Sequence, residues 1–155
     1  FKQLGMLLRD GEEVLRAAKL WCRRGWSHKK IVLVLTANMV ECRLHVFSRK
    51  SKKFERTLPW SNTRPLAVEA QSEVRFDLEC IYEQKEGGEV CRKYHYFDEG
   101  NTGVVEKFVA SISAISRTRE QYVLGSLGAP AHEALKAQLR KTKKESMTQK
   151  YCVIA

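Results

Sequence analysis

The sequence predicts an α+β fold in which one bent antiparallel sheet of seven strands is followed by a helix that caps it. Two observations lead to this prediction. Up to residue 97, short segments alternate apolar with polar residues at the two-residue period of a β-strand. From Val104 onward, the apolar residues recur at the spacing of an amphipathic helix. The chain of 155 residues is long enough for one such domain and an appended tail.

The first segments of the chain fit more than one structure. Residues 1–13 are compatible with a short helix or with an irregular arm. Residues 13–22 (EVLRAAKLWC) alternate imperfectly, and their propensity alone favours a helix. A basic turn at residues 23–30 leads into residues 31–36 (IVLVLT), which are predicted to form a strand because they are apolar and mostly β-branched.

Further strands are expected at short intervals before the helix. Extended or alternating segments are residues 40–48, 54–60, 65–70, 74–83 and 91–97. Gly87 and Gly88 lie in the turn between the last two segments. Asn101 and Thr102 are candidate caps of the helix, whose apolar stripe is Val104, Val105, Phe108, Val109, Ile112 and Ile115.

Strands first and a single helix last is the arrangement of the pleckstrin-homology superfold, in which the helix closes one end of the sheet. An eight-stranded barrel without a closing helix is the alternative. The folded domain is expected to span residues 9–118, and residues 119–155 to be a linker and a basic tail. The composition shifts at Arg117: residues 117–131 contain two glycines and a proline, and residues 132–146 have the composition of a short basic helix.

The net charge of +10 is concentrated in two parts of the chain. Residues 16–56 contain twelve Lys and Arg against two Glu, a balance of +10. Residues 57–116 contain six basic against ten acidic residues, and residues 117–155 contain eight against three. Such a distribution favours an anionic partner.

Apolar runs and cysteines point to a cytosolic protein without a membrane span. No stretch approaches the roughly 18 apolar residues of a membrane-spanning helix, and the start of the chain lacks the pattern of a secretion signal. The cysteines are odd in number and unclustered, which indicates reduced thiols. No metal or cofactor is expected. Four cysteines are expected to be small buried residues: Cys22, Cys42, Cys80 and Cys91.

The sequence contains no motif of an enzyme. G-x-S-x-G, a Gly-rich phosphate loop before a helix and H-E-x-x-H are all missing. Asp77 and Glu79 alternate with apolar residues and are expected on the solvent-exposed face of a strand. The protein is therefore not expected to be an enzyme. Nothing places a nucleophile beside any of the histidines, which are His28, His45, His95 and His132.

Two basic turns form the candidate binding site. The first turn is surrounded by Arg23, Arg24, His28, Lys29 and Lys30, with Trp21 and Trp26 beside it. The second contains Arg49, Lys50, Lys52 and Lys53. If the first four strands form a meander, both turns lie at the same open end of the sheet. Cations gathered there would bind phosphate groups, and Trp26 would be placed to enter a membrane interface. Solvated basic loops without a ligand are the alternative.

Nucleic acid is the other anionic partner that the charge suggests. Tyr94 and Tyr96 alternate on the last strand, as do the aromatic residues of sheets that stack single-stranded RNA. The strand at residues 31–36 has no aromatic residue, however, and the motifs of common RNA-binding modules are absent. No nucleic-acid partner is therefore expected.

Four stretches, taken in order, resemble a known family: RDGEEVLRAAKLWCRRG, KKIVLVLT, KKFERTLPWSNTRPLAVEA and VRFDLECIYE. They resemble the phosphoinositide-binding N-terminal domain of the large Sec-type subunit of the exocyst, and the related domain of the syntaxin-binding protein amisyn. The resemblance covers residues 9–116. The features of the family fall on Thr36, residues 53–56, Trp60, residues 66–68 and residues 76–78. The last strand departs from the family, because RKYHYFDEGNTGVVEKF stands in place of a KWVAS-like strand.

The resemblance implies a pleckstrin-homology fold that binds phosphatidylinositol bisphosphate at the plasma membrane during vesicle tethering. Rho-type small GTPases and exocyst or SNARE proteins would be its partners. Trp60 and Phe76 would be core residues. Lipid contacts would be made by Arg23, Arg24, Lys29 and Lys30, supported by Arg49, Lys50, Lys52, Lys53 and Arg56. The alternative is a protein-interaction domain of the same fold that binds a small GTPase or a peptide.

The residues Cys152 to Ala155 (CVIA) match the C-a-a-X pattern for farnesylation of Cys152. One lipid chain anchors a protein only marginally, so stable anchoring needs a second signal. Basic residues near an anionic leaflet contribute about 1 kcal/mol each. Those before Cys152 are Arg140, Lys141, Lys143, Lys144 and Lys150. The sequence thus predicts a cytoplasmic protein held peripherally at the plasma membrane.

Overall fold

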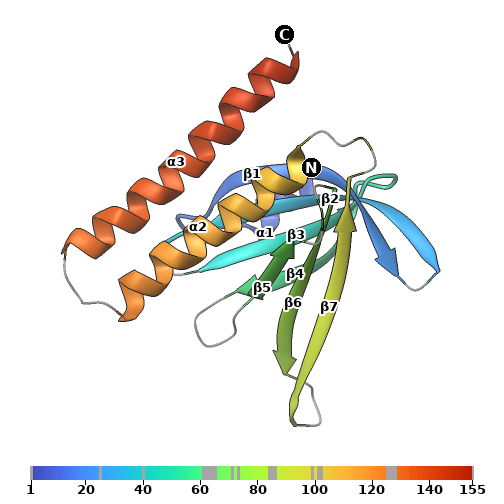
Figure 1. Cartoon of the computed structure of the whole chain (residues 1–155), viewed down its shortest axis with the longest axis horizontal. Helices are drawn as coiled ribbons and strands as arrows, with labels where there is room; N and C mark the ends of the chain where they lie inside the picture. Colours follow the sequence, from blue (N-terminus) through green and yellow to red (C-terminus); the bar gives the residue numbers. More distant parts are fainter. Residues whose placement is uncertain are drawn as a thin grey trace.

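The computed structural model describes residues 2–24, 26–39, 41–60, 66–70, 72, 74–83, 87–98, 100, 103–124 and 129–154. These residues form an α+β fold in which one curled antiparallel sheet is followed by two long helices (Figure 1). The α+β class and the order of sheet and helix are as predicted. A short helix, α1 (Lys2–Leu7), precedes the sheet.

The strands are β1 (Glu13–Arg24), β2 (Ser27–Ala37), β3 (Cys42–Ser48), β4 (Phe54–Trp60), β5 (Leu66–Ala70), β6 (Arg75–Glu83) and β7 (Glu89–Phe97). Within the described ranges their order in the sheet is β4-β3-β2-β1-β7-β6-β5, and neighbouring strands are antiparallel. The first four strands therefore form a meander. Curling of the sheet brings β4 close to β6.

Residues 13–22 belong to a strand, although their propensity favours a helix. β1 pairs with β2 along its length, and it also pairs with β7 over residues 21–23. A register shift between Val14 and Arg16 turns both Leu15 and Arg16 into the structure. This bulge explains the imperfect alternation. Tertiary pairing thus overrides local propensity here.

The core lies between the inner face of the sheet and helix α2 (Val104–Leu124). The predicted apolar stripe faces inward, and Phe108, Ile112 and Ile115 are completely buried. The Phe108 ring stacks on that of Phe76, with 6.3 Å between the centroids. Phe76 is thus a core residue, as the resemblance implies. Cys22 and Cys42 are buried free thiols, whereas the side chains of Cys80, Cys91 and Trp60 lie outside the described set.

Helix α2 continues to Leu124, so the linker predicted to begin at residue 119 does not begin there, and residues 119–124 are helical. One of these residues, Arg119, is buried and bonds to the sheet. The Arg119 guanidinium donates hydrogen bonds to the carbonyls of Asn38 at 2.7 Å and Met39 at 3.2 Å, and to Cys42 Sγ at 3.4 Å. These bonds connect the helix to the turn between β2 and β3.

Helix α3 (Ala129–Ile154) lies against α2 and β1 (Figure 1). Leu135 and Thr142 are buried, and Lys143 Nζ lies 3.3 Å from Glu13 Oε2. The helix predicted at residues 132–146 is therefore longer than expected, and it packs on the domain. Across the described part of the chain, no helix combines the length and the hydrophobicity needed to span a bilayer.

A polar network is buried where α1 covers the outer face of β2 and β3. Arg43 donates hydrogen bonds to Glu12 Oε2 at 2.8 Å and to the carbonyl of Leu7 at 2.6 Å. His45 is completely buried, with its ring nitrogens 2.9 Å from the hydroxyls of Thr36 and Thr57. Burial and the charge of Arg43 lower the pKa of His45 to about 4, against the opposing effect of Glu12.

We predict that the free energy of unfolding decreases as the pH falls from about 6.5 to 4. The unfolded chain binds a proton at His45 near pH 6.5, whereas the folded chain resists protonation until about pH 4. The stability present above pH 6.5 is therefore lost through this interval, with a magnitude on the order of 3 kcal/mol. Urea unfolding at a series of pH values measures the effect.

The same titration of two variants isolates the contribution of His45. His45→Gln should lose less stability than the wild type between pH 6.5 and 4, because glutamine does not titrate. His132→Gln, at an exposed position on α3, should behave as the wild type. An identical pH dependence in His45→Gln and the wild type would contradict the prediction.

Candidate anion-binding site

The β1–β2 hairpin ends in a charged tip that extends beyond the core. Residues 31–37 of β2 are buried, whereas residues 27–30 are exposed. The change occurs where β3 ends, because β2 pairs with β3 only from Ile31 onward. Beyond that point β2 pairs with β1 alone. In this end of the hairpin, called the ribbon below, β1 still pairs with β7 at residues 21–23, so β2 forms an edge and its side chains at residues 27–30 are exposed and polar or charged.

The register places the cations of the tip on both faces of this ribbon. Directly opposite residues in an antiparallel pair share a face. Arg23 lies opposite His28, and Trp21 lies opposite Lys30, so these four side chains share the outer face. Lys29 lies opposite Cys22, whose buried side chain belongs to the inner face.

Aromatic rings support the outer face at the base of the ribbon. The Trp21 ring stacks on Phe97 with 6.3 Å between centroids, and His28 packs edge-on against Phe97 at 5.1 Å. Lys30 Nζ lies 5.0 Å from the centroid of the Trp21 ring, which is the geometry of a cation–π contact. Lys30 is therefore held over an aromatic surface that Trp21, His28 and Phe97 form.

The second basic turn, between β3 and β4, lies beside the first hairpin. The backbone N–H of Arg49 donates a hydrogen bond to the carbonyl of Lys30 at 3.1 Å. The Arg49 guanidinium donates to the carbonyl of Leu20 at 2.8 Å and to that of Ile31 at 3.4 Å. Arg49 thus holds the two turns together. The exposed cations of this turn are Lys50, Lys52 and Lys53.

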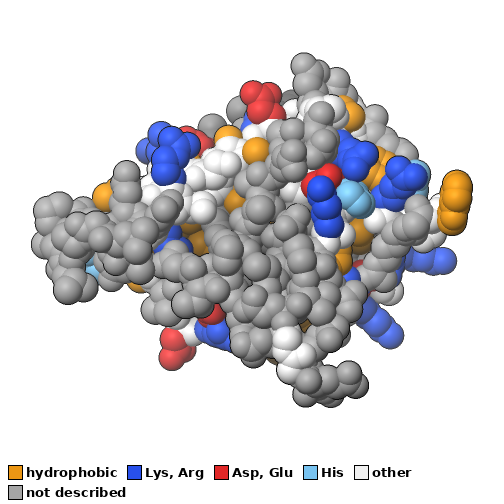
Figure 2. All heavy atoms as spheres, turned by 60° about the horizontal axis from the view of Figure 1, so that its bottom comes forward, with side chains coloured by type: hydrophobic (Ala, Val, Ile, Leu, Met, Phe, Trp, Pro, Cys, Tyr) orange, Lys and Arg blue, Asp and Glu red, His pale blue; other side chains and the backbone are white. Residues whose placement is uncertain are grey.

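Figure 2 shows Lys and Arg side chains, with histidine and hydrophobic side chains among them, at the end of the molecule where β1 and β2 join. The structure therefore brings the two predicted turns together at one end. Arg24 is the last residue of β1, and its side chain lies outside the described set. Cys152 is in the last turn of α3, and its side chain is likewise not described.

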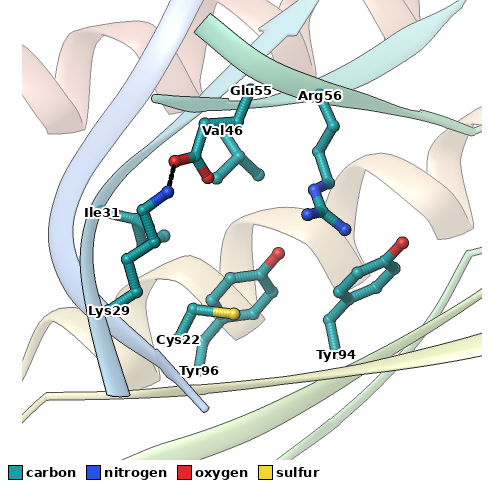
Figure 3. Close-up of a pocket in the computed structure, with 8 residues that line it drawn as sticks. All are labelled: Cys22, Lys29, Ile31, Val46, Glu55, Arg56, Tyr94 and Tyr96. Atoms are coloured by element: carbon teal, nitrogen blue, oxygen red, sulfur yellow. Dashed lines mark hydrogen bonds and ion pairs between the residues drawn. The ribbon is translucent and has the colours of Figure 1, made fainter. Parts of the chain in front are cut away.

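A pocket lies on the inner face behind the ribbon, lined by residues of β1, β2, β3, β4 and β7 (Figure 3). The Lys29 ammonium points into it and donates a hydrogen bond to the Glu55 carboxylate. On the opposite wall the Arg56 guanidinium lies over the Tyr94 ring, with 5.1 Å between Cζ and the ring centroid. The lining residues are Cys22, Lys29, Ile31, Val46, Glu55, Arg56, Tyr94 and Tyr96.

The pocket combines cations, a carboxylate and phenolic hydroxyl groups. Arg56 can donate to phosphate or carboxylate oxygens in a bidentate manner, while Glu55 neutralises much of the charge of Lys29. Burial raises the pKa of the Cys22 thiol, so this group stays protonated near neutral pH. The pocket has room for about one water molecule rather than a phosphate group, and it presents no thiolate.

The sequence missed the contribution of the inner wall to this site. Curling of the sheet brings Glu55 of β4 to Lys29 of β2, and it brings Tyr94 of β7 to Arg56 of β4. Tyr94 alternates with buried Tyr96 along the strand in a way that resembles an ordinary core pattern. Only the contact of Tyr94 with Arg56 across the curled sheet distinguishes Tyr94 from a core residue.

Asp77 is a further difference from expectation, because it is 3% exposed rather than on a solvated face. It accepts hydrogen bonds from His95 Nδ1 at 2.7 Å and from Arg75 Nε at 3.3 Å, and Lys93 Nζ lies at 3.8 Å. Burial alone would raise the pKa of Asp77, but hydrogen bonds from His95 and Arg75 outweigh it and lower the pKa. Across the described ranges, no three His, Cys, Asp or Glu residues are grouped as metal ligands.

Comparison with known proteins gives little beyond these observations. No protein-family model and no curated protein matches the sequence. Among solved structures, the chain is similar to the hSac2 domain from the human phosphoinositide phosphatase Sac2. The match has 10% sequence identity, covers 79% of this chain and 78% of that chain, and has a TM-score of 0.47. A likeness at this level establishes neither a shared family nor a shared activity.

We predict that Arg49 stabilises the fold, unlike the lysines of its own turn. Arg49→Ala should lower the free energy of unfolding by about 1–3 kcal/mol, because it removes hydrogen bonds to partly buried carbonyls. Lys50→Ala, at an exposed position in the same turn, should change it by less than about 0.5 kcal/mol. Urea unfolding at neutral pH provides the measurement, and equally small effects of both substitutions would refute the role of Arg49.

Proposed function

We propose that this chain is a pleckstrin-homology-like module that binds phosphatidylinositol bisphosphate at the cytoplasmic face of the plasma membrane. It would recruit the protein there during exocytosis or vesicle tethering. One observation carries the proposal: two basic turns meet at one end of the sheet, joined by the hydrogen bonds of Arg49. Their exposed lysines are Lys29, Lys30, Lys50, Lys52 and Lys53.

The architecture supports the same proposal. A curled antiparallel sheet is followed by a helix packed on its inner face, which is the order expected of a pleckstrin-homology-like fold. The exposed ends of the β1–β2 and β3–β4 hairpins would meet the membrane, while α2 closes the core. Lys30, Lys50, Lys52 and Lys53, near an anionic leaflet, would each add about 1 kcal/mol of binding free energy, whereas Lys29 is paired with Glu55. The affinity should therefore fall steeply with salt.

We predict that reversing two charges in the second turn weakens vesicle binding by the full chain. Lys50→Glu/Lys53→Glu should raise the dissociation constant for phosphatidylcholine vesicles containing phosphatidylinositol bisphosphate about thirtyfold, from about 1 kcal/mol per cation removed. Cosedimentation measures binding. These two positions are preferred to Lys29 and Lys30, whose contacts with Glu55 and Trp21 involve the fold.

The matched control is Lys107→Glu/Arg117→Glu, which makes the same change in net charge at exposed positions of α2. It should change the dissociation constant by less than about threefold, because screening limits the effect of charges distant from the membrane. Equal losses in both variants would show that net charge alone governs binding. Wild-type binding that is independent of the phosphoinositide would also count against the proposal.

A protein-interaction domain of the same fold is the second candidate. Within the described residues β4 and β5 form the edges of the sheet, and an edge strand can pair with a peptide through backbone hydrogen bonds. A small GTPase, or an exocyst or SNARE protein, would be the partner in this case. Such binding should survive Lys50→Glu/Lys53→Glu and added salt, whereas phosphoinositide binding should not.

We also propose that Cys152 carries a farnesyl group in a chain whose last residue is Ala155. The lipid and the basic turns would together supply the two signals that stable anchoring requires. Mass spectrometry of the protein purified from eukaryotic cells should find the modified cysteine. Cys152→Ser should move the protein from the membrane fraction toward the soluble fraction. An unmodified Cys152 in such cells would rule out this anchor.

A further inference from the structure

Trp26 lies at the turn between β1 and β2 with its side chain wholly exposed, at 101% of the reference area. Among the described residues, the large exposed hydrophobic side chains are Trp26 and Met6. Neither the core clusters nor the described aromatic contacts include Trp26. An indole has an apolar body and a polar N–H, and it favours the interface between a membrane and water.

Cations lie behind Trp26 on both faces of the ribbon. Arg23 and Lys30 are on the outer face, and Lys29 is on the inner face. At a rise of about 3.3 Å per residue, the backbone positions from His28 to Lys30 lie roughly 7–13 Å along the strand from that of Trp26. This order, with an apolar tip and cations behind it, matches the order of acyl boundary and phosphate groups in a bilayer.

Because the cations lie on both faces of the ribbon, they favour one orientation of the hairpin on a membrane. If the outer face lay flat on a membrane, Lys29 would point away from it toward Glu55 and the pocket. If the tip pointed at the membrane, cations of both faces would lie near the headgroups. The second turn supports this orientation, because Arg49 N is bonded to Lys30 O and the exposed lysines of the turn therefore start at the depth of Lys30.

We propose that the β1–β2 hairpin enters the bilayer tip first, with the Trp26 indole in the interfacial region and the cations of both turns at the phosphate groups. This inference rests on the proposed function for the class of lipid. It adds that the ligand is the surface of an anionic bilayer, in which the headgroup and the interfacial region are bound together. A soluble headgroup would engage only the cations.

The first test compares vesicles with the soluble headgroup, using the full chain. Trp26→Ala should weaken binding to phosphatidylcholine vesicles containing phosphatidylinositol bisphosphate by tenfold or more, since burial of a large apolar side chain is lost. Its affinity for soluble inositol trisphosphate, measured by calorimetry, should stay unchanged. Met6→Ala, at the other exposed apolar side chain, should bind the vesicles as the wild type does.

The second test locates the indole directly. Vesicles of the same composition with brominated acyl chains should quench part of the tryptophan fluorescence of the wild type. The chain has three tryptophans, so Trp26→Phe is the variant that assigns the quenching. Quenching should be lost in Trp26→Phe and retained in Trp21→Phe.

The outcomes separate this inference from the function on which it rests. If the wild type binds the vesicles but Trp26→Ala binds equally well and Trp26 is not quenched, insertion is wrong and headgroup binding stands. If the wild type binds neither vesicles nor the soluble headgroup, both proposals fail. Loss of headgroup affinity in Trp26→Ala would also overturn insertion, because it would place Trp26 in the headgroup site itself.

Discussion

The pairing of β1 with β2 is the constraint on which the rest of the structure depends. These two strands stay in register from a bulge near Val14 to the turn at Trp26. The two halves of this hairpin lie in different environments. In one half they are covered by neighbouring strands and bury an apolar core. In the other half β2 has no partner except β1, and its side chains become basic and exposed. One hairpin thus connects the core to the candidate site, so the position of the site follows from the register of the core.

Arg49 extends this constraint to the second turn. Its guanidinium donates hydrogen bonds to carbonyls on both strands of the hairpin and so links the β3–β4 turn to the ribbon. Arg49, which was predicted to bind lipid, therefore has a structural role, and the lysines around it remain exposed. Arg119 has the same role at the turn between β2 and β3, where it connects α2 to the sheet. In both cases a long cation donates hydrogen bonds to backbone carbonyls far away in the sequence and so links its own segment to the sheet.

The periodicity of the sequence was sufficient to predict the strands after residue 30, the inward stripe of α2 and the proximity of the two basic turns. Interactions across the sheet were not predictable from it. Arg49 and Arg119 bond to carbonyls far away in the sequence, and no local pattern distinguishes them from solvated cations. Asp77 was expected on a solvated face because its strand alternates, but cations from β6 and β7 cover it. The strand at residues 13–22 was ambiguous because its bulge interrupts the two-residue period.

The central claim is that the turns of the β1–β2 and β3–β4 hairpins are the surface that meets an anionic membrane. Hydrogen exchange of the full chain, measured by mass spectrometry with and without vesicles containing phosphatidylinositol bisphosphate, tests it most directly. Exchange should slow at residues 23–30 and 49–53 and remain unchanged in β6 and α2. Protection along the edge strand β4 or β5, with both turns unaffected, would contradict the claim and identify the sheet edge as the binding surface.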